Sequence, residues 1–368
     1  MPLSQHLRVI DYQSLPCWSD DRLGEAFSAF RRSAIRALEA PYKSGALGVE
    51  AGAFESAFRE ARILENPDDA TARDFFERHF APCLIYPREG EQGFVTGFYE
   101  PHVEASPVKT AKFTVPLLAR PADLVKVDDC NRPEGFDSYL AFARQSDDGL
   151  VEYHDRRAIE QGALEGIAEP LAWVADKVDA FFIHVQGATR LVMPDGSVTR
   201  LTYAAKSGQR FTGPGRILIE LGEIPAEKVS MQAIRAWFRD NLDRVDQILQ
   251  QNRSYIFFCK ADVTDTALGP VAAAKVPLTA GRSLAVDRLL HTFGTPFFIN
   301  APTLTAFGGE PFARLMIAQD TGSAIVGPAR GDLFAGSGDA AGEIAGVVRH
   351  PADFYALVPR SLVKGAWR

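Results

Sequence analysis

The amino-acid sequence predicts a mainly β protein with a helical N-terminal region. Three observations support this fold class. Apolar residues recur at helical spacing up to about residue 85. From Gly93 onward, short β-prone runs alternate with Gly, Pro and Asp. A pair of helical patterns between residues 230 and 251 interrupts these runs before strands resume. The sequence contains no internal repeat and no low-complexity tract.

The N-terminal region predicts three amphipathic helices. Ser19 is the expected N-cap of the first, with Asp20 and Asp21 in its first turn. The apolar positions of all three helices are expected to form core, and they are Leu23, Phe27, Phe30, Ala34 and Leu38, then Phe54, Phe58 and Ile63, then Phe75, Phe76 and Phe80.

The central and C-terminal parts predict strands at residues 94–99, 180–185, 190–193 and 255–259. Residues 194–197, Pro-Asp-Gly-Ser, predict a tight turn between two strands. Ser230 is the expected cap of a helix over residues 231–238, and a second helix is expected over residues 242–251. A short helix is also expected near Ala340.

Composition excludes several classes of function. The chain has 368 residues, which is enough for two domains or for one large all-β domain. Its hydrophobic fraction of 46% is enough to bury a sizeable core. A net charge of −7 disfavours a nucleic-acid partner, which would need a basic face. Cys17, Cys83, Cys130 and Cys259 lie far apart and are expected to be isolated buried thiols, although a Cys17–Cys83 bridge is open. The cysteines and the scattered histidines show no metal-site spacing, so we expect no metal ion and no cofactor.

No apolar run is long enough to span a bilayer. The first fifteen residues lack the apolar stretch of a signal peptide. On this pattern the protein either stays inside the cell or is a processed or truncated form.

Chemistry-bearing residues are densest between Arg314 and Asp339. An apolar strand leads to Asp320, and Asp332 and Asp339 follow among glycines. Carboxylates at strand ends beside glycine turns suit general acid–base catalysis, although such aspartates also commonly bond their own backbone. Asp320-Thr-Gly suggests an aspartic protease, but that chemistry needs a second copy, and Asp265-Thr-Ala lacks the glycine.

Three further clusters are candidates for ligand contact. Thr96, Tyr99 and Glu100 lie together and suit a sugar site, or else Tyr99 is core and Glu100 is solvated. Strand alternation would place Phe182, His184 and Gln186 on one face, where a ligand contact and a satisfied buried side chain are both open. Arg282 follows a glycine and could hold a carboxylate or pair with Asp287.

Taken together, these clusters resemble the membrane-bound lytic murein transglycosylase A family. The resemblance extends from about residue 93 to residue 358, in the order usual for the family. Departures occur at Val326, at Ala188-Thr189 and at Ala335, where the family often has Lys, Ser-Gly and Trp. The segments that carry the resemblance are residues 97–101, 179–187, 203–208, 230–237, 252–258, 276–287 and 314–339.

The resemblance implies a double-psi β-barrel domain formed by residues 1–105 and 243–368. Residues 106–242 would form a second, inserted β domain, with a glycan strand in the groove between the two. It implies that Asp332 is the catalytic residue. The residues expected to bind substrate or to support the site are Asp320, Asp339, Thr96, Tyr99, Glu100, Gln186, Lys206 and Arg282.

The implied activity is cleavage of the β-1,4 bond between N-acetylmuramic acid and N-acetylglucosamine in peptidoglycan, with formation of a 1,6-anhydromuramyl end. Asp332 would act first as acid and then as base, which requires that its pKa be raised. The resemblance implies a monomer in the periplasm, associated with the outer membrane, with peptidoglycan and cell-wall enzymes as partners. The alternatives are a glycoside hydrolase that pairs Asp332 with Asp320 or Asp339, and a barrel that binds polysaccharide without cleaving it.

Overall fold

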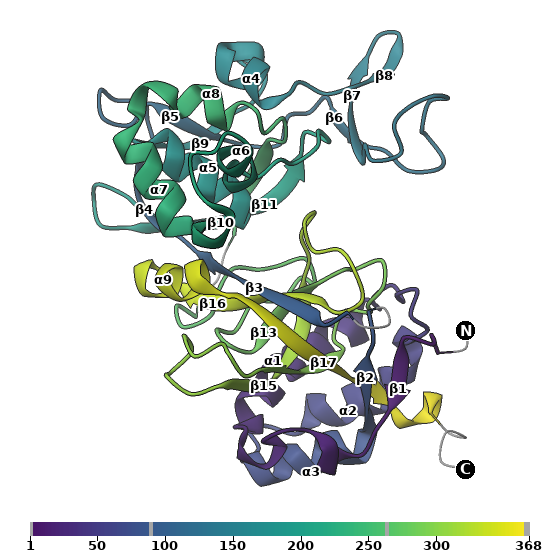
Figure 1. Cartoon of the computed structure of the whole chain (residues 1–368). Coiled ribbons are helices and arrows are strands. Elements are labelled where there is room, and N and C mark those ends of the chain that lie inside the picture. The colour runs from purple at the N-terminus through teal and green to yellow at the C-terminus, as the bar shows by residue number, and fades with distance from the viewer. Residues whose placement is uncertain (1–2, 88–90, 262–264, 364–368) are drawn as a thin grey trace. The chain divides into compact units, whose positions relative to one another are not determined.

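A computed structural model describes residues 3–87, 91–261 and 265–363. The chain divides into two compact units (Figure 1). The first consists of Met1–Tyr99 and Val263–Arg368, and the second is the intervening Glu100–Asp262. The expected domain boundaries, after residues 105 and 242, differ from this division. The reason is that strands β4 (His102–Ser106) and β12 (Ile256–Lys260) hydrogen-bond within the sheet of the second unit.

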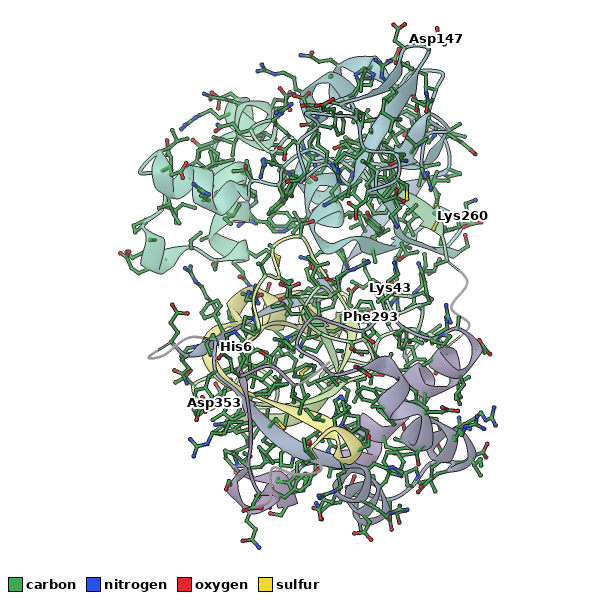
Figure 2. All side chains as sticks on the ribbon, turned by 90° about the vertical axis from the view of Figure 1, so that its right-hand side faces the viewer. His6, Lys43, Asp147, Lys260, Phe293 and Asp353 are labelled. Atoms are coloured by element: carbon green, nitrogen blue, oxygen red, sulfur yellow. The ribbon has the colours of Figure 1, made fainter. Side chains whose placement is uncertain are left out.

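The N-terminal helices of the first unit pack around phenylalanine side chains. Phe27, Phe30 and Phe75 are fully buried, and the Phe75 ring centroid lies 4.9 Å from that of Phe27 and 5.6 Å from that of Phe30. Side chains fill the interior of this unit (Figure 2). The helices are α1 (Leu23–Glu39), α2 (Glu55–Ile63) and α3 (Asp69–His79).

Three expectations for this region are wrong in detail. Ser19 does not cap α1, because residues 18–20 form a separate 3-10 turn and Asp21 is buried. Ile63 is 76% exposed and is therefore not core. Phe80 is buried, but it starts a strand rather than continuing α3.

The first unit contains an eight-stranded sheet in the order β1-β2-β17-β14-β15-β13-β16-β3. Because β17 also pairs with β3, six of these strands form a closed ring of hydrogen-bonded neighbours. Helix α9 (Asp339–Val347) connects β16 to β17. The strands are β1 (Leu7–Val9), β2 (Phe80–Ile85), β3 (Gly93–Glu100), β13 (Ser283–Val286), β14 (Pro296–Ala301), β15 (Phe312–Asp320), β16 (Arg330–Ser337) and β17 (Arg349–Pro359).

Strands β3, β13 and β16 bury apolar side chains on both faces. Val95, Leu284 and Leu333 belong to the main core that includes the N-terminal helices. The residues that alternate with them face the other way. There Phe98, Leu278, Ala285 and Phe334 form a separate cluster, called here the small apolar cluster.

The second unit contains a six-stranded sheet in the order β12-β11-β10-β4-β9-β5 and a three-stranded sheet β6-β7-β8. Helices α5, α6, α7 and α8 share apolar contacts with one another. The remaining elements are β5 (Val115–Leu118), β6 (Leu124–Lys126), β7 (Phe142–Ser146), β8 (Gly149–Val151), α4 (Arg156–Ala158), β9 (Pro170–Val174), α5 (Lys177–Gln186), β10 (Ala188–Val192), β11 (Val198–Lys206), α6 (Pro214–Glu220), α7 (Met231–Asp240) and α8 (Val245–Leu249).

Local signals predicted two features of this unit correctly. The tight turn at residues 194–197 connects β10 to β11. Ser230 caps α7, since its hydroxyl oxygen accepts a hydrogen bond from the backbone N–H of Ala233 at 3.1 Å.

The strand expected over residues 180–185 is wrong, because this segment is helix α5. Asp176 caps its start by accepting a hydrogen bond from the Asp179 backbone at 2.9 Å. Gly187 ends the helix with a φ of 75°, a conformation that glycine adopts without strain. These two caps outweigh the β preference of the apolar residues between them. Phe182, His184 and Gln186 therefore do not share a strand face.

Cys83 is buried, and burial raises its thiol pKa to about 12. Cys17, Cys130 and Cys259 are exposed, which contradicts the expectation of buried thiols at these positions. All four cysteines are unbridged. Within the described part of the chain, no helix is long and apolar enough to cross a membrane.

Candidate active site

Asp332 and Asp320 flank the same residue of the central strand β13. Ala285 is the register partner of Asp332 on β16 and of Asp320 on β15. Residues directly opposite one another in a sheet point to the same face. Adjacent strands lie about 4.8 Å apart, so the two aspartate Cα atoms are separated by roughly 10 Å. Both carboxylates consequently share the face of the small apolar cluster, to which Ala285 belongs.

An irregularity in β15 gives Asp320 this orientation. Ala318 pairs with Leu284, but the next residue pair is Ala285 with Asp320, so Gln319 is passed over. The Gln319 side chain is fully buried and its amide donates to the carbonyl of Ala29 on α1 at 2.9 Å. This β-bulge places the carboxylate, rather than Gln319, on the site face.

Thr96 holds the Asp332 carboxylate. The threonine hydroxyl donates a hydrogen bond to Asp332 Oδ1 at 2.5 Å. The same hydroxyl oxygen accepts a hydrogen bond from Arg330 Nη2 at 2.7 Å. The guanidinium of Arg330 also donates to the Gly331 carbonyl and lies 5.8 Å from the centre of the Phe94 ring.

The Asp332 pKa is raised from its ordinary value. Burial is the largest cause, since it disfavours the charged form. The positive charge of Arg330 and the hydrogen bond from Thr96 act in the opposite direction without cancelling the effect of burial. Asp332 therefore holds a proton to higher pH than a solvated aspartate does.

The Asp320 pKa is raised from 3.8 to about 6. Burial is again the largest cause, and the nearby charge of Asp332 adds to it. Backbone hydrogen bonds from Thr321 and from Ala273, the latter at 3.2 Å, and the charge of Lys275 partly offset these effects. The two aspartates are thus electrostatically coupled, and the ionisation of one disfavours that of the other.

Close packing of α9 on β3 positions the strand that carries Thr96. A Cβ on Gly97 would lie 2.9 Å from the Cα of Ala345. A Cβ on Gly342 would lie 2.9 Å from the ring of Tyr99. Tyr99 is only 7% exposed, so the interpretation of this residue as core is confirmed.

Asp339 begins α9 and does not cap it. It is the exposed first residue of the helix, and the N-cap is Gly338, whose φ is 85°. No side-chain capping hydrogen bond is formed. Its negative charge instead lies in the first turn, where it interacts favourably with the helix dipole.

Arg282 holds carboxylates inside the protein. It is 2% exposed, and its guanidinium lies 2.8 Å from Asp21 and 3.2 Å from Glu25. Of the two alternatives for Arg282, the pairing with Asp287 is not formed, because the Asp287 carboxylate accepts from the backbone N–H groups of Leu289 and Gly327. Arg282 therefore joins the start of β13 to the N-terminal helices and is a supporting residue.

Glu100 is neither solvated nor open to a ligand. Its side chain has no exposed surface, and one carboxylate oxygen lies 2.7 Å from Arg190 Nε and 3.1 Å from Arg200 Nη2. Both arginines belong to the second unit. Glu100 thus serves as the buried anion that joins β10 and β11 to the start of this unit.

Gln186 and Lys206 end α5 and β11 in the second unit, and both side chains are partly exposed. The Lys206 ammonium lies 5.3 Å from the centre of the Tyr139 ring, and Arg210 lies 4.5 Å from the same ring. Burial lowers the pKa of Lys206. Lys206 and Arg210 thus place two cationic groups over one aromatic ring, a combination that suits a polar ligand.

His184 is core rather than a ligand-binding residue. Its Nδ1 accepts a hydrogen bond from Arg156 Nη2 at 3.0 Å, and its ring centroid lies 4.4 Å from that of Tyr255. Burial and the charge of Arg156 lower the His184 pKa well below its ordinary value. Arg156 also donates to the carbonyls of Asn252 and Ser254.

Sequence reasoning missed Arg330 as a member of the site. The available signal was strand alternation, because residues two apart on β16 face the same way and Arg330 precedes Asp332 by two. Arg156 was also missed, and no local pattern in the sequence distinguishes it from an exposed arginine.

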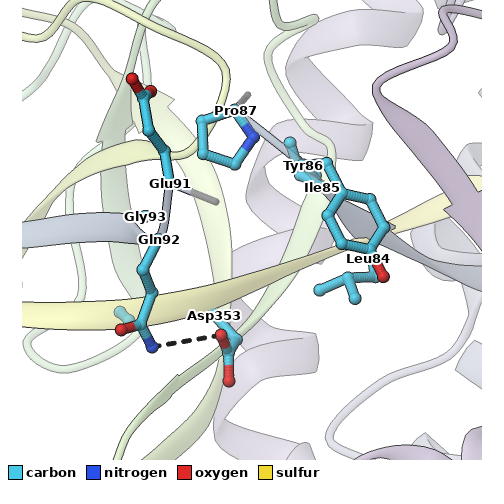
Figure 3. A pocket seen from close by; sticks show the side chains of 9 residues that line it. Leu84, Ile85, Tyr86, Pro87, Glu91, Gln92, Gly93 and Asp353 are labelled. Carbon is cyan, nitrogen blue, oxygen red and sulfur yellow. Dashed lines mark hydrogen bonds between the residues drawn. The ribbon is translucent and has the colours of Figure 1, made fainter. Parts of the chain in front are cut away.

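A separate pocket of about 170 Å³ lies against the first unit (Figure 3). Its lining includes Tyr86, Gln92 and Asp353, and the Gln92 amide donates to Asp353 at 3.3 Å. None of the predicted site residues lines this pocket.

Comparison with known proteins identifies the family. Residues 94–259 match the model of the MltA specific insert domain, and residues 282–358 match that of the 3D domain. The chain is 31% identical over 268 residues to membrane-bound lytic murein transglycosylase A of Escherichia coli K12. That match covers 71% of this chain and 64% of the relative, so the chain spans less than two thirds of the curated relative's length.

Solved structures extend the similarity to nearly the whole chain. A membrane-bound lytic murein transglycosylase from Agrobacterium tumefaciens superposes with a TM-score of 0.91 at 49% identity, over 97% of this chain and 99% of that one. MltA from Neisseria gonorrhoeae superposes with a TM-score of 0.78 at 30% identity, over 96% and 92%. This chain belongs to the membrane-bound lytic murein transglycosylase A family.

Proposed function

We propose that this protein is a peptidoglycan lytic transglycosylase and that Asp332 is its catalytic residue. The observation that carries the proposal is the state of Asp332, which combines a raised pKa with a carboxylate held in place by Thr96. Family membership supports the reaction class. The bond cleaved would be the β-1,4 link from N-acetylmuramic acid to N-acetylglucosamine.

In the first step Asp332 acts as a general acid. It transfers its proton to the glycosidic oxygen as the bond from that oxygen to C1 of the muramic acid breaks. The leaving N-acetylglucosamine departs with a free hydroxyl. Because the partly buried Asp332 favours its neutral form, the acid is available above the pH at which a solvated aspartate would have ionised.

In the second step the Asp332 carboxylate acts as a general base. It takes the proton from the C6 hydroxyl of the same muramic acid while that oxygen bonds to C1. The product is a 1,6-anhydro ring, Asp332 is protonated again, and no water is consumed. Attack within one sugar has a high effective molarity, which reduces the stabilisation that the protein must supply.

The roles of the other candidate site residues are predictions, and a different observation supports each of them. Asp320 is a proposed supporting residue because it shares the face of Asp332 and the charge of Asp332 raises its pKa. Lys206 is a proposed sugar contact because it is partly exposed and its ammonium lies over the Tyr139 ring. Gln186 is a proposed sugar contact because it is partly exposed at the end of α5. Asp339 is exposed, which is compatible with a substrate contact but does not single it out.

The closed ring of six strands supports our proposal that the first unit is a double-psi β-barrel. It contains the parallel pair β13–β15 beside the antiparallel pair β13–β16. An E. coli MltA structure with bound chitohexaose shares the fold at 23% identity, with a TM-score of 0.69. By analogy with that ligand, we propose a glycan chain as the substrate.

We also propose that the protein acts in the periplasm at the envelope, since peptidoglycan lies outside the cytoplasm. The relatives are named membrane-bound, which supports an envelope location. Association with the outer membrane, the monomeric state and cell-wall enzyme partners stay predictions.

The second candidate function is a two-carboxylate glycoside hydrolase. It is favoured because Asp320 and Asp332 lie on either side of Ala285 and point to the same face of the sheet. Inverting glycosidases hold their carboxyl groups about 6.5–9.5 Å apart, and a Cα separation of roughly 10 Å can accommodate that spacing. The two reactions differ in the use of water.

Digestion of purified peptidoglycan in water labelled with heavy oxygen separates the candidates. A transglycosylase releases anhydromuramyl ends without label, and mass spectrometry would show them. A hydrolase releases reducing ends that carry the label. Binding to peptidoglycan without any soluble product would instead indicate a polysaccharide-binding protein.

A further inference from the structure

We propose that Arg330 is a positioning residue that fixes the proton of the Thr96 hydroxyl and thereby determines which oxygen of Asp332 carries the catalytic proton. This inference rests on the proposed function, because it concerns how Asp332 delivers its proton. The three side chains come from two strands of the first unit, β3 and β16.

The Thr96 hydroxyl bonds to a group that can only donate and to a carboxylate oxygen. A guanidinium has only donors, so the bond between Arg330 Nη2 and Thr96 Oγ1 requires the threonine oxygen to accept. The hydroxyl has a single proton, which remains for Asp332 Oδ1 at 2.5 Å. Oδ1 is therefore held as an acceptor, and the proton of neutral Asp332 is left to Oδ2.

Without Arg330 the threonine hydroxyl could rotate. Its oxygen could then accept the proton of neutral Asp332 on Oδ1, in a bond that would turn the acid away from a substrate. With Arg330 present, that orientation would require the Thr96 oxygen to accept hydrogen bonds from both Arg330 and Asp332. The proton of the Thr96 hydroxyl would then lose Asp332 Oδ1 as its acceptor. Arg330 thus favours the arrangement in which Oδ2, which is not bonded to Thr96, carries the proton.

The position of Arg330 is itself well determined. Its guanidinium bonds the Gly331 carbonyl and lies against the Phe94 ring, and Thr96 is held on β3 by close packing at Gly97. Such anchoring keeps the arginine in one rotamer, which a residue that orients a proton requires.

Other charges near Asp332 set the background. Asp320 lies on the other side of β13 from Asp332, and the positive charge of Lys275 lowers the Asp320 pKa. Asp320 and Lys275 are unchanged in the variants of Arg330. Arg349 of β17 is the register partner of Thr96 and is exposed. The test must therefore compare variants that differ only at Arg330 and Thr96.

Three variants test the proposal with peptidoglycan as substrate and released anhydromuropeptides as readout. Thr96→Val keeps the shape and removes the hydroxyl. Arg330→Met removes both charge and hydrogen bond, and Arg330→Lys keeps the charge but loses the planar fork. We expect each to lower kcat by about tenfold to a hundredfold with little change in KM, since neither residue is proposed to touch the glycan.

The pH profile separates positioning from folding. Thr96 and Arg330 both stabilise the Asp332 carboxylate, so Thr96→Val and Arg330→Met should raise its pKa. The alkaline limb of kcat/KM should then move upward by about one pH unit or more. Arg330→Lys should lower kcat with a smaller displacement of that limb.

The double variant tests whether Arg330 acts through Thr96. If it does, Thr96→Val with Arg330→Met should cost about as much as the more severe single variant. Multiplicative losses would show independent action and overturn the proposal, as would an Arg330→Met protein with unchanged kcat and pH profile.

Arg314→Met is the matched control. Arg314 is also partly buried, donates to a carbonyl and lies over aromatic rings, but its partners are Phe307 and Phe312. It should leave the pH profile unchanged, and a displaced limb would count against the proposal. NMR titration of the Asp332 carboxyl in wild-type protein and in Thr96→Val reports the pKa change without activity. Absence of anhydro products from wild-type protein would refute the proposed function alone.

Discussion

Asp320→Asn should stabilise the folded protein at neutral pH. The carboxyl has a folded-state pKa of about 6 against an ordinary value of 3.8, so folding disfavours its charged form. Each pH unit of difference corresponds to about 1.4 kcal/mol, which gives at most about 3 kcal/mol for this residue. Partial exposure and the lost coupling to Asp332 reduce this figure, and we expect a gain of about 1–2 kcal/mol.

The pH dependence distinguishes this effect from a general change in packing. Below pH 3.8 the carboxyl is neutral in both folded and unfolded protein, so it contributes no penalty. The penalty grows as pH rises between 3.8 and about 6, and it is complete above that range. Asparagine carries no charge, and its carbonyl oxygen can still accept the hydrogen bond from the Ala273 backbone.

Urea unfolding at several pH values measures the difference. The free energy of unfolding of Asp320→Asn should exceed that of the wild type above pH 6 and should converge with it near pH 3. The exposed Asp339→Asn serves as control and should change stability by less than about 1 kcal/mol. A gain that is constant with pH, or a loss at neutral pH, would refute the argument that Asp320 is buried at an electrostatic cost.

Two further predictions concern the acid and the buried arginine. Asp332→Asn should reduce release of anhydromuropeptides by about 10⁴-fold or more while far-UV circular dichroism and binding to peptidoglycan stay near wild type, because one group serves both proton transfers; near-normal turnover would show that the acid is misassigned. Arg282→Met should lower the free energy of unfolding by about 3–5 kcal/mol, because it leaves Asp21 buried without its cation. Chemical denaturation measures this loss, and a loss below about 1 kcal/mol would show that the ion pair contributes little to stability.

Local signals in the sequence predicted those elements whose determinants are local. The cap at Ser230 and the turn at residues 194–197 depend on a few adjacent residues, and both were correctly placed. The apolar run within α5 is β-prone and predicts a strand, whereas Asp176 and Gly187 at its two ends are the caps of a helix. Both caps are recognisable in the sequence, and together they predict the helix.

The candidate site could be predicted only in part. Asp332 was identified through the family resemblance, and its hydrogen bond to Thr96 joins residues more than 200 positions apart. The bulge at Gln319 depends on contacts with α1, and no pattern within β15 indicates it. Similarly, Arg282 and Glu100 have buried partners distant in sequence, so solvated and buried roles could not be distinguished.

The central claim is that this protein cleaves glycan strands without water and with Asp332 as its acid and base. Mass spectrometry of the muropeptides released from purified peptidoglycan in water labelled with heavy oxygen tests it most directly. We predict 1,6-anhydromuramyl ends that contain no label with the wild-type protein and no such ends with Asp332→Asn. Labelled reducing ends, or unlabelled anhydro ends released equally well by Asp332→Asn, would contradict the account.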